Sequence, residues 1–183
     1  MMGKRALEAA EALIAATGLE GRITPEEFVE RREAILDELF PTSRLMPGAE
    51  ALVRRLHGAG VGIAVATSSH RRHYEAKTRR HGDLFALFSH VTTGDSVSRG
   101  KPDPEIFTKA ASLFPGETPD PARIIVFEDA PAGVEAARAA GMRVVLVPDA
   151  RLAEEQRRGA CQVLGSLEEF DFEAWGFPPL EAK

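Results

Sequence analysis

Several features are scarce or missing in this sequence, and each absence excludes a class of protein. Cys161 is the single cysteine, so no disulfide can form within the chain. No run of about 18 apolar residues and no basic-then-apolar leader occurs, so nothing predicts a membrane span or a secretion signal. The net charge of -5 gives no general attraction to nucleic acid or to membrane surfaces. We therefore expect a cytoplasmic protein with neither a nucleic-acid nor a membrane partner.

The first 40 residues carry a helical pattern. Thr24-Pro25-Glu26-Glu27 is a capping box with proline at the first helical position, and it predicts a helix that ends at Pro41. An alanine-rich segment over 4–16 predicts another helix before it. Two helices alone bury little apolar surface, so this segment needs apolar partners elsewhere.

From residue 46 to residue 183 the pattern alternates between helix and strand. Strands are predicted over 61–66, 90–93, 124–127, 144–147 and 162–164, and helices over 49–56, 70–80, 84–88, 104–113 and 132–140. The strands are apolar on both faces, which is typical of a parallel sheet covered by helices on each side. The sequence therefore predicts an α/β fold, and its hydrophobic content of 44% is enough for a substantial core.

Polar residues with useful chemistry follow three of the predicted strands. Thr67-Ser68-Ser69 comes after the first, Lys101 lies in the connection after the second, and Glu128-Asp129 ends the third. Ligands of open α/β sheets bind beyond the carboxyl ends of the strands, so we expect these groups to meet at one edge. A lysine suits a phosphate dianion, and a carboxylate pair suits a divalent cation. Together they predict a metal-dependent phosphate site.

Other patterns favour ordinary structural roles. Asp103 before Pro104 suits the start of a helix better than acid catalysis. The basic run over 70–80 is typical of a solvated helix face, and the acidic net charge disfavours a nucleic-acid site there. Cys161 has apolar neighbours and suits a core position better than that of a nucleophile. No Gly-x-Ser-x-Gly elbow is present, which disfavours a serine hydrolase.

Five segments of the sequence resemble the haloacid dehalogenase-like hydrolases, and among them the pseudouridine-5'-phosphatase-like members. They are "LMPGAEALVRRL" from Leu45, "VATSS" from Val65, "LFSHVTTGD" from Leu87, "GKPDPEIF" from Gly100 and "VFEDAPAGVEAARAAGM" from Val126. The resemblance implies a Rossmann-like parallel sheet with a helical cap. It makes residues 1–45 a partial helical cap and residues 46–183 the core.

The resemblance also implies a role for each site residue. Lys101 would be the catalytic lysine that steadies nucleophile and phosphate, and Thr67 and Ser68 would bind the phosphate with it. Glu128 and Asp129 would hold a Mg²⁺ cofactor. The substrate would be a small phosphorylated metabolite, namely a nucleotide or sugar monophosphate such as pseudouridine 5'-phosphate. A sugar-phosphate mutase of a neighbouring family stays open as an alternative.

One part of the family's site has no counterpart in this sequence. These enzymes begin with an apolar strand ending in Asp-x-Asp, whose first Asp attacks phosphorus and binds the metal. No aspartate of this sequence has another Asp two residues later. In the family that strand lies in the middle of the sheet, between the strands that carry Thr67 and Glu128. We therefore expect a core that lacks its central first strand, together with a truncated cap.

Two hypotheses about function follow. In the first, the chain comes from a Mg²⁺-dependent phosphatase lineage but is inactive or a truncated isoform, because the nucleophilic Asp is absent. In the second, it is a non-catalytic binding or regulatory isoform that associates with a partner or a full-length homologue. The exposed edge of the interrupted sheet would favour such association, including self-association.

Overall fold

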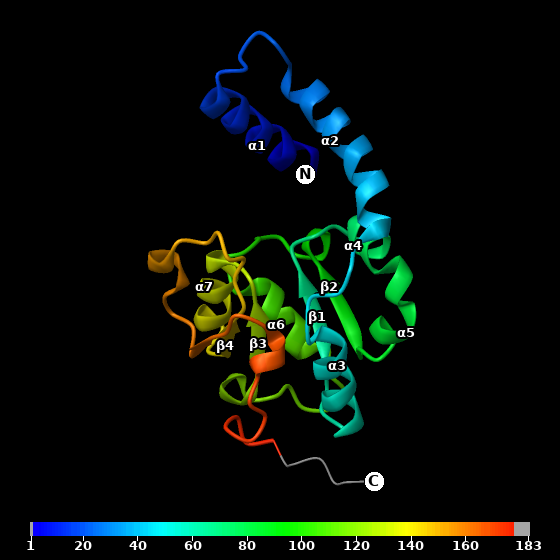
Figure 1. The fold of residues 1–183 in the computed structure, drawn as a ribbon, viewed down its shortest axis with the longest axis vertical. Helices are drawn as coiled ribbons and strands as arrows, with labels where there is room; N and C mark the ends of the chain where they lie inside the picture. Colours follow the sequence, from blue (N-terminus) through cyan, green and yellow to red (C-terminus); the bar gives the residue numbers. More distant parts are fainter. Residues whose placement is uncertain (1, 178–183) are drawn as a thin grey trace. The chain divides into compact units, whose positions relative to one another are not determined.

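The structure, a computed structural model, describes residues 2–177 and divides into two compact units. A helical unit contains the residues up to Ser43 together with Arg71–His81, and an α/β unit contains Arg44–His70 and the residues from Gly82 on (Figure 1). The division thus places Arg71–His81 with the N-terminal helices, whereas the sequence pattern put this segment in the core. The assignment of residues 1–45 to a partial cap stays a prediction. None of the described helices is both long enough and apolar enough to cross a membrane.

The helical unit begins with the helices expected from the sequence. It contains α1 (Met2–Thr17), α2 (Pro25–Leu39), η1 (Phe40–Thr42), α4 (Arg71–Thr78) and η2 (Arg79–His81). The predicted capping box is confirmed, because the Thr24 hydroxyl accepts from the Glu27 amide at 3.1 Å and the Glu27 carboxylate accepts from the Thr24 amide at 3.0 Å. Two amides at the start of α2 are satisfied in this way, which fixes where the helix begins.

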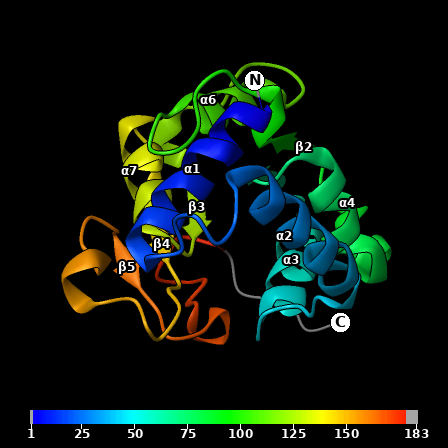
Figure 2. The ribbon, with the colours of Figure 1, turned by 90° about the horizontal axis from the view of Figure 1, so that it is seen from above.

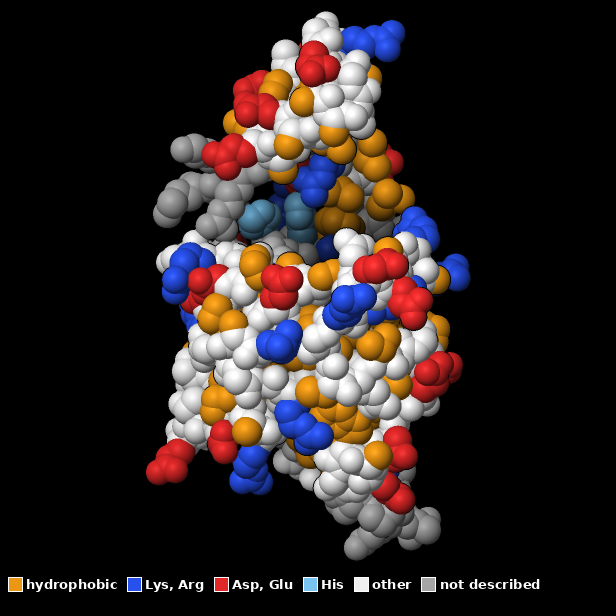
Figure 3. Space-filling model, turned by 90° about the vertical axis from the view of Figure 1, so that its left-hand side faces the viewer, with side chains coloured by type: hydrophobic (Ala, Val, Ile, Leu, Met, Phe, Trp, Pro, Cys, Tyr) orange, Lys and Arg blue, Asp and Glu red, His pale blue; other side chains and the backbone are white. Residues whose placement is uncertain are grey.

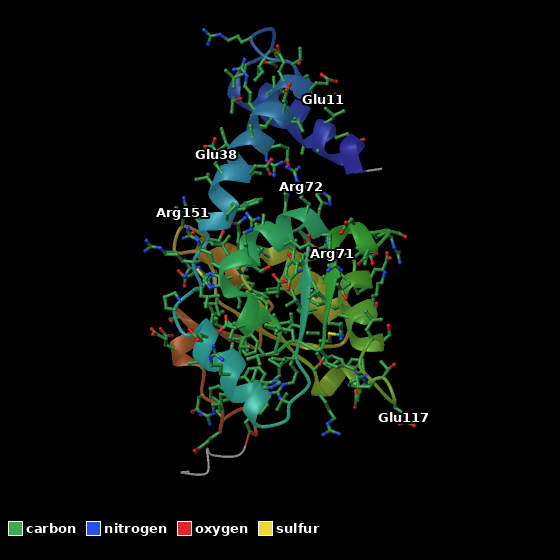
Figure 4. The ribbon with its side chains drawn as sticks, turned by 90° about the vertical axis from the view of Figure 1, so that its right-hand side faces the viewer. Glu11, Glu38, Arg71, Arg72, Glu117 and Arg151 are labelled. Atoms are coloured by element: carbon green, nitrogen blue, oxygen red, sulfur yellow. The ribbon has the colours of Figure 1, made fainter. Side chains whose placement is uncertain are left out.

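Helix α4 belongs to the helical unit because basic side chains along it bind α2 and η1. Arg72 forms an ion pair with Asp37, and His73 Nε2 lies 2.6 Å from Glu33 Oε2. The rings of His73 and Phe40 meet edge-on, with centroids 5.1 Å apart. Figure 4 shows Arg72 on α4. The arginines of the basic run are exposed, as predicted for a solvated helix face, whereas His73, 12% exposed, is enclosed by its contacts with Glu33 and Phe40.

The α/β unit contains two parallel sheets. In the first, β1 (Ala64–Thr67) pairs with β2 (His90–Thr93); in the second, β4 (Arg143–Leu146) lies between β3 (Ile125–Glu128) and β5 (Gln162–Val163) (Figure 1). The unit's α-helices are α3 (Ala49–Gly58), α5 (Gly82–Phe85), α6 (Glu105–Ser112) and α7 (Pro131–Ala139). Its short 3-10 turns are η3 (Gly94–Ser96), η4 (Pro121–Arg123), η5 (Glu154–Arg157) and η6 (Leu167–Glu169). The predicted α/β fold with parallel strands is confirmed.

The hydrogen-bonded sheet is interrupted between β1 and β3. Within residues 2–177, β1 pairs with β2 alone, β3 pairs with β4 alone, and no ladder joins the two sheets. The interruption lies between the strands that end at Thr67 and Glu128, which is where the family resemblance placed the absent central strand. Each of these two strands therefore has one edge without a ladder partner in the described part of the chain.

Side chains of β3 and β4 alternate between two cores on opposite faces of their sheet. Val126, Val144 and Leu146 belong to one core, which residues of α6 and α7 complete. Val145 belongs to the other core, together with Leu52 of α3. Figure 2 shows α6 and α7 next to each other, and they are in contact. The prediction of helices on both faces of a parallel sheet is confirmed.

A cluster of aromatic rings closes the second core. Phe170 is 5% exposed, and its ring centroid lies 4.9 Å from that of Phe127, 5.0 Å from that of Phe172 and 5.8 Å from that of Trp175. Aromatic pairs at such distances stabilise a fold beyond the burial of their area. Trp175 Nε1 also donates to Gln162 Oε1 at 2.7 Å, which ties the segment to β5. The segment after β5 is therefore part of the core.

We predict that Phe170→Ala lowers the free energy of unfolding by about 3–5 kcal/mol, because it leaves a cavity between aromatic rings. Chemical denaturation followed by circular dichroism measures the change. The matched control is Leu113→Ala, which truncates a side chain that is 50% exposed and should change stability by no more than about 0.5 kcal/mol. Equal losses in the two variants would contradict the role given to Phe170.

Candidate functional site

The carboxyl ends of β1 and β3 meet at Lys101. Its Nζ forms an ion pair with Glu128 Oε1 and lies 3.4 Å from the carbonyl oxygen of Ala66. The ring centroid of Phe107 lies 4.7 Å from Nζ, in a cation–π contact. The side chains of Lys101 and Glu128 are 12% and 7% exposed, and charges buried to this degree need a partner. The lysine therefore connects two strands that share no ladder.

The segment before Lys101 is fixed by Glu105, in the first turn of α6. The Glu105 carboxylate accepts hydrogen bonds from the amides of Ser98 at 2.7 Å and Arg99 at 2.9 Å. These two amides hold the pKa of the Glu105 carboxyl below its ordinary value. Asp103 Oδ1 accepts from the Glu105 amide at 2.9 Å and so satisfies a donor at the start of α6, although the helix begins one residue later than predicted, with Pro104 as its N-cap. The lysine is thus held by contacts on both sides of its turn.

The Thr67-Ser68-Ser69 turn packs against the end of β2. Thr67 Oγ1 accepts from the Ser69 amide at 3.1 Å, and the Ser69 carbonyl accepts from the Gly94 amide at 3.0 Å. A side chain at Gly94 would overlap the carbonyl oxygen of Ser68. Thr67 directly follows Ala66, whose carbonyl oxygen Lys101 reaches. The turn with the predicted phosphate-binding hydroxyls and the predicted catalytic lysine therefore share one strand end.

The two predicted metal acids have different surroundings although they are neighbours in sequence. The Glu128 carboxylate lies against Gly133 in the first turn of α7, so closely that a side chain at Gly133 would overlap it. Glu128 Oε2 also accepts from the Asp129 amide at 3.3 Å. Asp129 itself is exposed. Of the two carboxylates, Glu128 is therefore enclosed and ion-paired, whereas Asp129 is open to solvent.

The residues that the structure describes do not form a metal site by themselves. Among them, no group of three or more His, Cys, Asp or Glu side chains is gathered closely enough to hold an ion. Glu128 is bound to Lys101, and a Mg²⁺ ion favours near-octahedral oxygen coordination that a single exposed Asp129 does not supply. No catalytic step in this chain is therefore assigned to a metal. That Glu128 and Asp129 hold Mg²⁺ stays a prediction.

Comparison with known protein families agrees with the fold. A family model described as haloacid dehalogenase-like hydrolase matches residues 1–141, which is most of the chain. The chain belongs to the haloacid dehalogenase-like hydrolases. The resemblance of the chain to this family is thereby confirmed.

Several relatives of this chain are named as phosphatases. (DL)-glycerol-3-phosphatase 1, mitochondrial, and (DL)-glycerol-3-phosphatase 2, both of Arabidopsis thaliana, are 47% and 46% identical over 183 residues. These matches cover 99% of this chain but 61% and 76% of the two proteins, so the chain spans about three fifths of the first. "Probable pseudouridine-5'-phosphatase" of Drosophila melanogaster is 47% identical over 156 residues, which are 84% of this chain and 67% of that protein. The likeness to pseudouridine phosphatases is confirmed, and the glycerol-3-phosphatases match more of the chain.

Solved structures of the family share the fold. A HAD family hydrolase of Deinococcus radiodurans with bound phosphate and sodium superimposes with a TM-score of 0.72 at 28% identity, over 90% of this chain and 74% of the other. CbbY of Rhodobacter sphaeroides in complex with phosphate gives a TM-score of 0.63 at 29% identity, over 73% of this chain and 60% of the other. The α/β unit therefore has the Rossmann-like arrangement of haloacid dehalogenase-like hydrolases.

Three positions that shape the site were not identified from the sequence. Gly94 and Gly133 act through the side chain that they lack, and Glu105 acts through two backbone amides. For the glycines a signal was present: Gly94 comes directly after a strand, and Gly133 stands in the first turn of a helix that follows two acids. For Glu105 there was none, because an acid in the first turn of a helix is common.

We predict that Gly94→Ala displaces the Thr67-Ser68-Ser69 turn, since the new methyl group would overlap the carbonyl oxygen of Ser68. Overpacking of this kind costs about 1–3 kcal/mol, which corresponds to a melting temperature lower by roughly 2–12 °C in a chain of this size. Thermal unfolding measures the change. Gly58→Ala is the control, because no atom from outside its own helical backbone lies within 4 Å of the added methyl group. A Gly94→Ala protein as stable as the control would argue against the close approach.

Glu105→Gln should loosen the segment before Lys101, and the effect should depend on pH. A depressed carboxyl pKa means that Glu105 stabilises the folded state above its unfolded pKa of about 4.3, and that this contribution disappears as pH falls through the folded value. We expect faster hydrogen exchange at the Ser98 and Arg99 amides near pH 7, and a difference in melting temperature that shrinks as pH falls below the unfolded pKa and vanishes below the lowered folded pKa. Glu117→Gln, at a side chain that extends away from the fold in Figure 4, should change neither. A difference that persists unchanged in acid would contradict the role of the charge.

Proposed function

We propose that this chain carries the phosphate-binding part of a haloacid dehalogenase-like phosphatase and does not complete the reaction alone. The observation that carries the proposal is the position of Lys101, whose ammonium lies at the joint ends of β1 and β3 beside the Thr67 turn. There the lysine can offset charge on phosphoryl oxygens, and the hydroxyls of Thr67 and Ser68 can donate hydrogen bonds to them.

The covalent step is the part of the reaction that this chain leaves out. Phosphoryl transfer through an aspartyl-phosphate needs a carboxylate in line with the phosphorus, and the sequence contains no Asp-x-Asp. In the structure the anion beside Lys101 is Glu128. We infer that this chain hydrolyses phosphate esters at a negligible rate. A Mg²⁺ ion would take part only if further acidic side chains completed a metal site around Asp129.

The substrate class proposed is a small phosphate monoester. The names of the relatives specify a polyol phosphate, glycerol 3-phosphate, and a nucleotide, pseudouridine 5'-phosphate. Both share the phosphate dianion that Lys101 and Thr67 would bind, and they differ in the leaving group. A nucleic-acid polymer is not proposed: the face in Figure 3 shows basic side chains interspersed with acidic ones, and the net charge is -5. A cytoplasmic location stays part of the proposal.

A second candidate function is a non-catalytic binding or regulatory isoform. The interruption between β1 and β3 favours it, because each strand presents one edge without a ladder partner in the described chain. An edge of this kind accepts a further strand from another polypeptide, either a second copy or a full-length homologue. This candidate assigns the chain no turnover and does not require that it bind phosphate.

We predict that inorganic phosphate raises the melting temperature of the purified chain, because a ligand of the folded state stabilises it by mass action. Thr67→Val replaces the hydroxyl by a methyl group of the same size, and this variant should lose the phosphate effect. Turnover of glycerol 3-phosphate, pseudouridine 5'-phosphate and para-nitrophenyl phosphate should stay at the level of buffer, with (DL)-glycerol-3-phosphatase 2 as the positive control.

Two results would change this conclusion. Mg²⁺-dependent turnover that is abolished by Asp129→Ala would show a complete catalytic site, and no stabilisation by phosphate would remove the phosphate-binding role. Size-exclusion chromatography with light scattering separates the two candidates in the second case. A defined complex without phosphate binding supports the associating isoform, whereas a monomer without phosphate binding supports neither.

A further inference from the structure

The Lys101–Glu128 pair divides the acidic motif into two residues with different roles. The Glu128 carboxylate has Lys101 on one side, Gly133 on another and the Asp129 amide at 3.3 Å. Its side chain is 7% exposed, so little water reaches it. A divalent cation at Glu128 would have to take the carboxylate from the ammonium and then lie beside an unpaired Lys101. Both changes cost free energy in a poorly solvated place.

Gly133 explains why the carboxylate lies where it does. The position of a β-carbon on Gly133 coincides with the Glu128 carboxyl group, so any other residue would push the carboxylate away from Lys101. The φ angle of Gly133 is not positive, so the backbone itself does not require glycine there. The space above the first turn of α7 is therefore used by Glu128, and the missing side chain is what makes the ion pair sterically feasible.

We propose that in this chain Glu128 is the counter-ion of Lys101 and not a metal ligand, and that Gly133 is the positioning residue that sets it there. Of the two acids, Asp129 alone is then open to a cation. The proposal rests on the proposed function only in that Lys101 is the phosphate-binding lysine. In this role the Glu128 carboxylate balances the positive charge of Lys101 whenever no phosphate or other anion is bound to the lysine.

A double-mutant cycle of Lys101→Met and Glu128→Gln tests the pairing without any metal. Each single change leaves one buried charge without its partner, whereas the double variant removes the pair as a unit. We expect each single variant to melt at a lower temperature than the wild type and the double variant to regain most of the loss. Gly133→Ala should lower the melting temperature and should reduce the further effect of Glu128→Gln. Additive losses in the cycle would overturn the proposal.

Manganese binding, measured by electron paramagnetic resonance of free Mn²⁺, tests whether Glu128 is a counter-ion or a metal ligand. A mutated metal-site residue typically costs roughly tenfold or more in affinity. We expect that loss for Asp129→Asn, and an affinity within about twofold of wild type for the charge-neutral double variant. A tenfold loss in the double variant would identify Glu128 as a ligand and overturn the proposal. If the wild type binds no Mn²⁺, the melting cycle alone decides.

Neither measurement depends on turnover or on phosphate binding. The proposed function can therefore fail, with no stabilisation by phosphate, while the cycle still shows Lys101 and Glu128 as partners. Conversely, additive effects in the cycle with intact stabilisation by phosphate would remove the counter-ion role and leave the proposed function standing.

Discussion

The ion pair between Lys101 and Glu128 is the contact on which the arrangement of the strand ends depends. The two sheets of the α/β unit share no ladder, and at their carboxyl ends they are connected by the lysine, which contacts Ala66 of β1 and Glu128 of β3. A lysine this little exposed is tolerated only with an anion next to it. The position of Glu128, the glycine beneath it and the hydrogen-bonded segment before Lys101 all serve that requirement.

The fold could be predicted from the sequence where one physical rule dominates. Strands that are apolar on both faces can only be covered on both faces, and β3 and β4 indeed alternate between two cores, with Val144 in one and Val145 in the other. Boundaries were less accurate: the strand predicted over 61–66 is found at Ala64–Thr67. Val61 and Ile63 pack against the second core without entering the ladder, which begins opposite His90. The hydrophobicity of a segment indicates that it is buried, but not which of its residues pair with the neighbouring strand.

Part of the candidate site could likewise be predicted from the sequence pattern, and part could not. Glu128 ends one strand and Lys101 lies in the connection that follows another, and the rule for ligand sites in α/β sheets brings them together. Gly94 and Gly133 stand at positions that carry a signal in the sequence, but their role could not be derived from it, because it depends on which residue lies opposite the side chain that each of them lacks. The basic side chains of α4 show the same limit. Their spacing revealed a charged helix face, but not that Arg72 would bind an acid of α2.

The same ion pair explains how Lys101 can be accommodated with little exposure in a chain that lacks the attacking aspartate. A buried ammonium needs an anion whichever reaction is or is not performed, and in this structure Glu128 fills that place. The acidic motif therefore does not by itself demonstrate a metal site, since one of its two carboxylates is accounted for by the lysine. In this chain a metal-dependent catalytic step would therefore need carboxylates beyond that pair. Asp129 is one such carboxylate, and an aspartyl-phosphate mechanism requires another placed in line with the phosphorus.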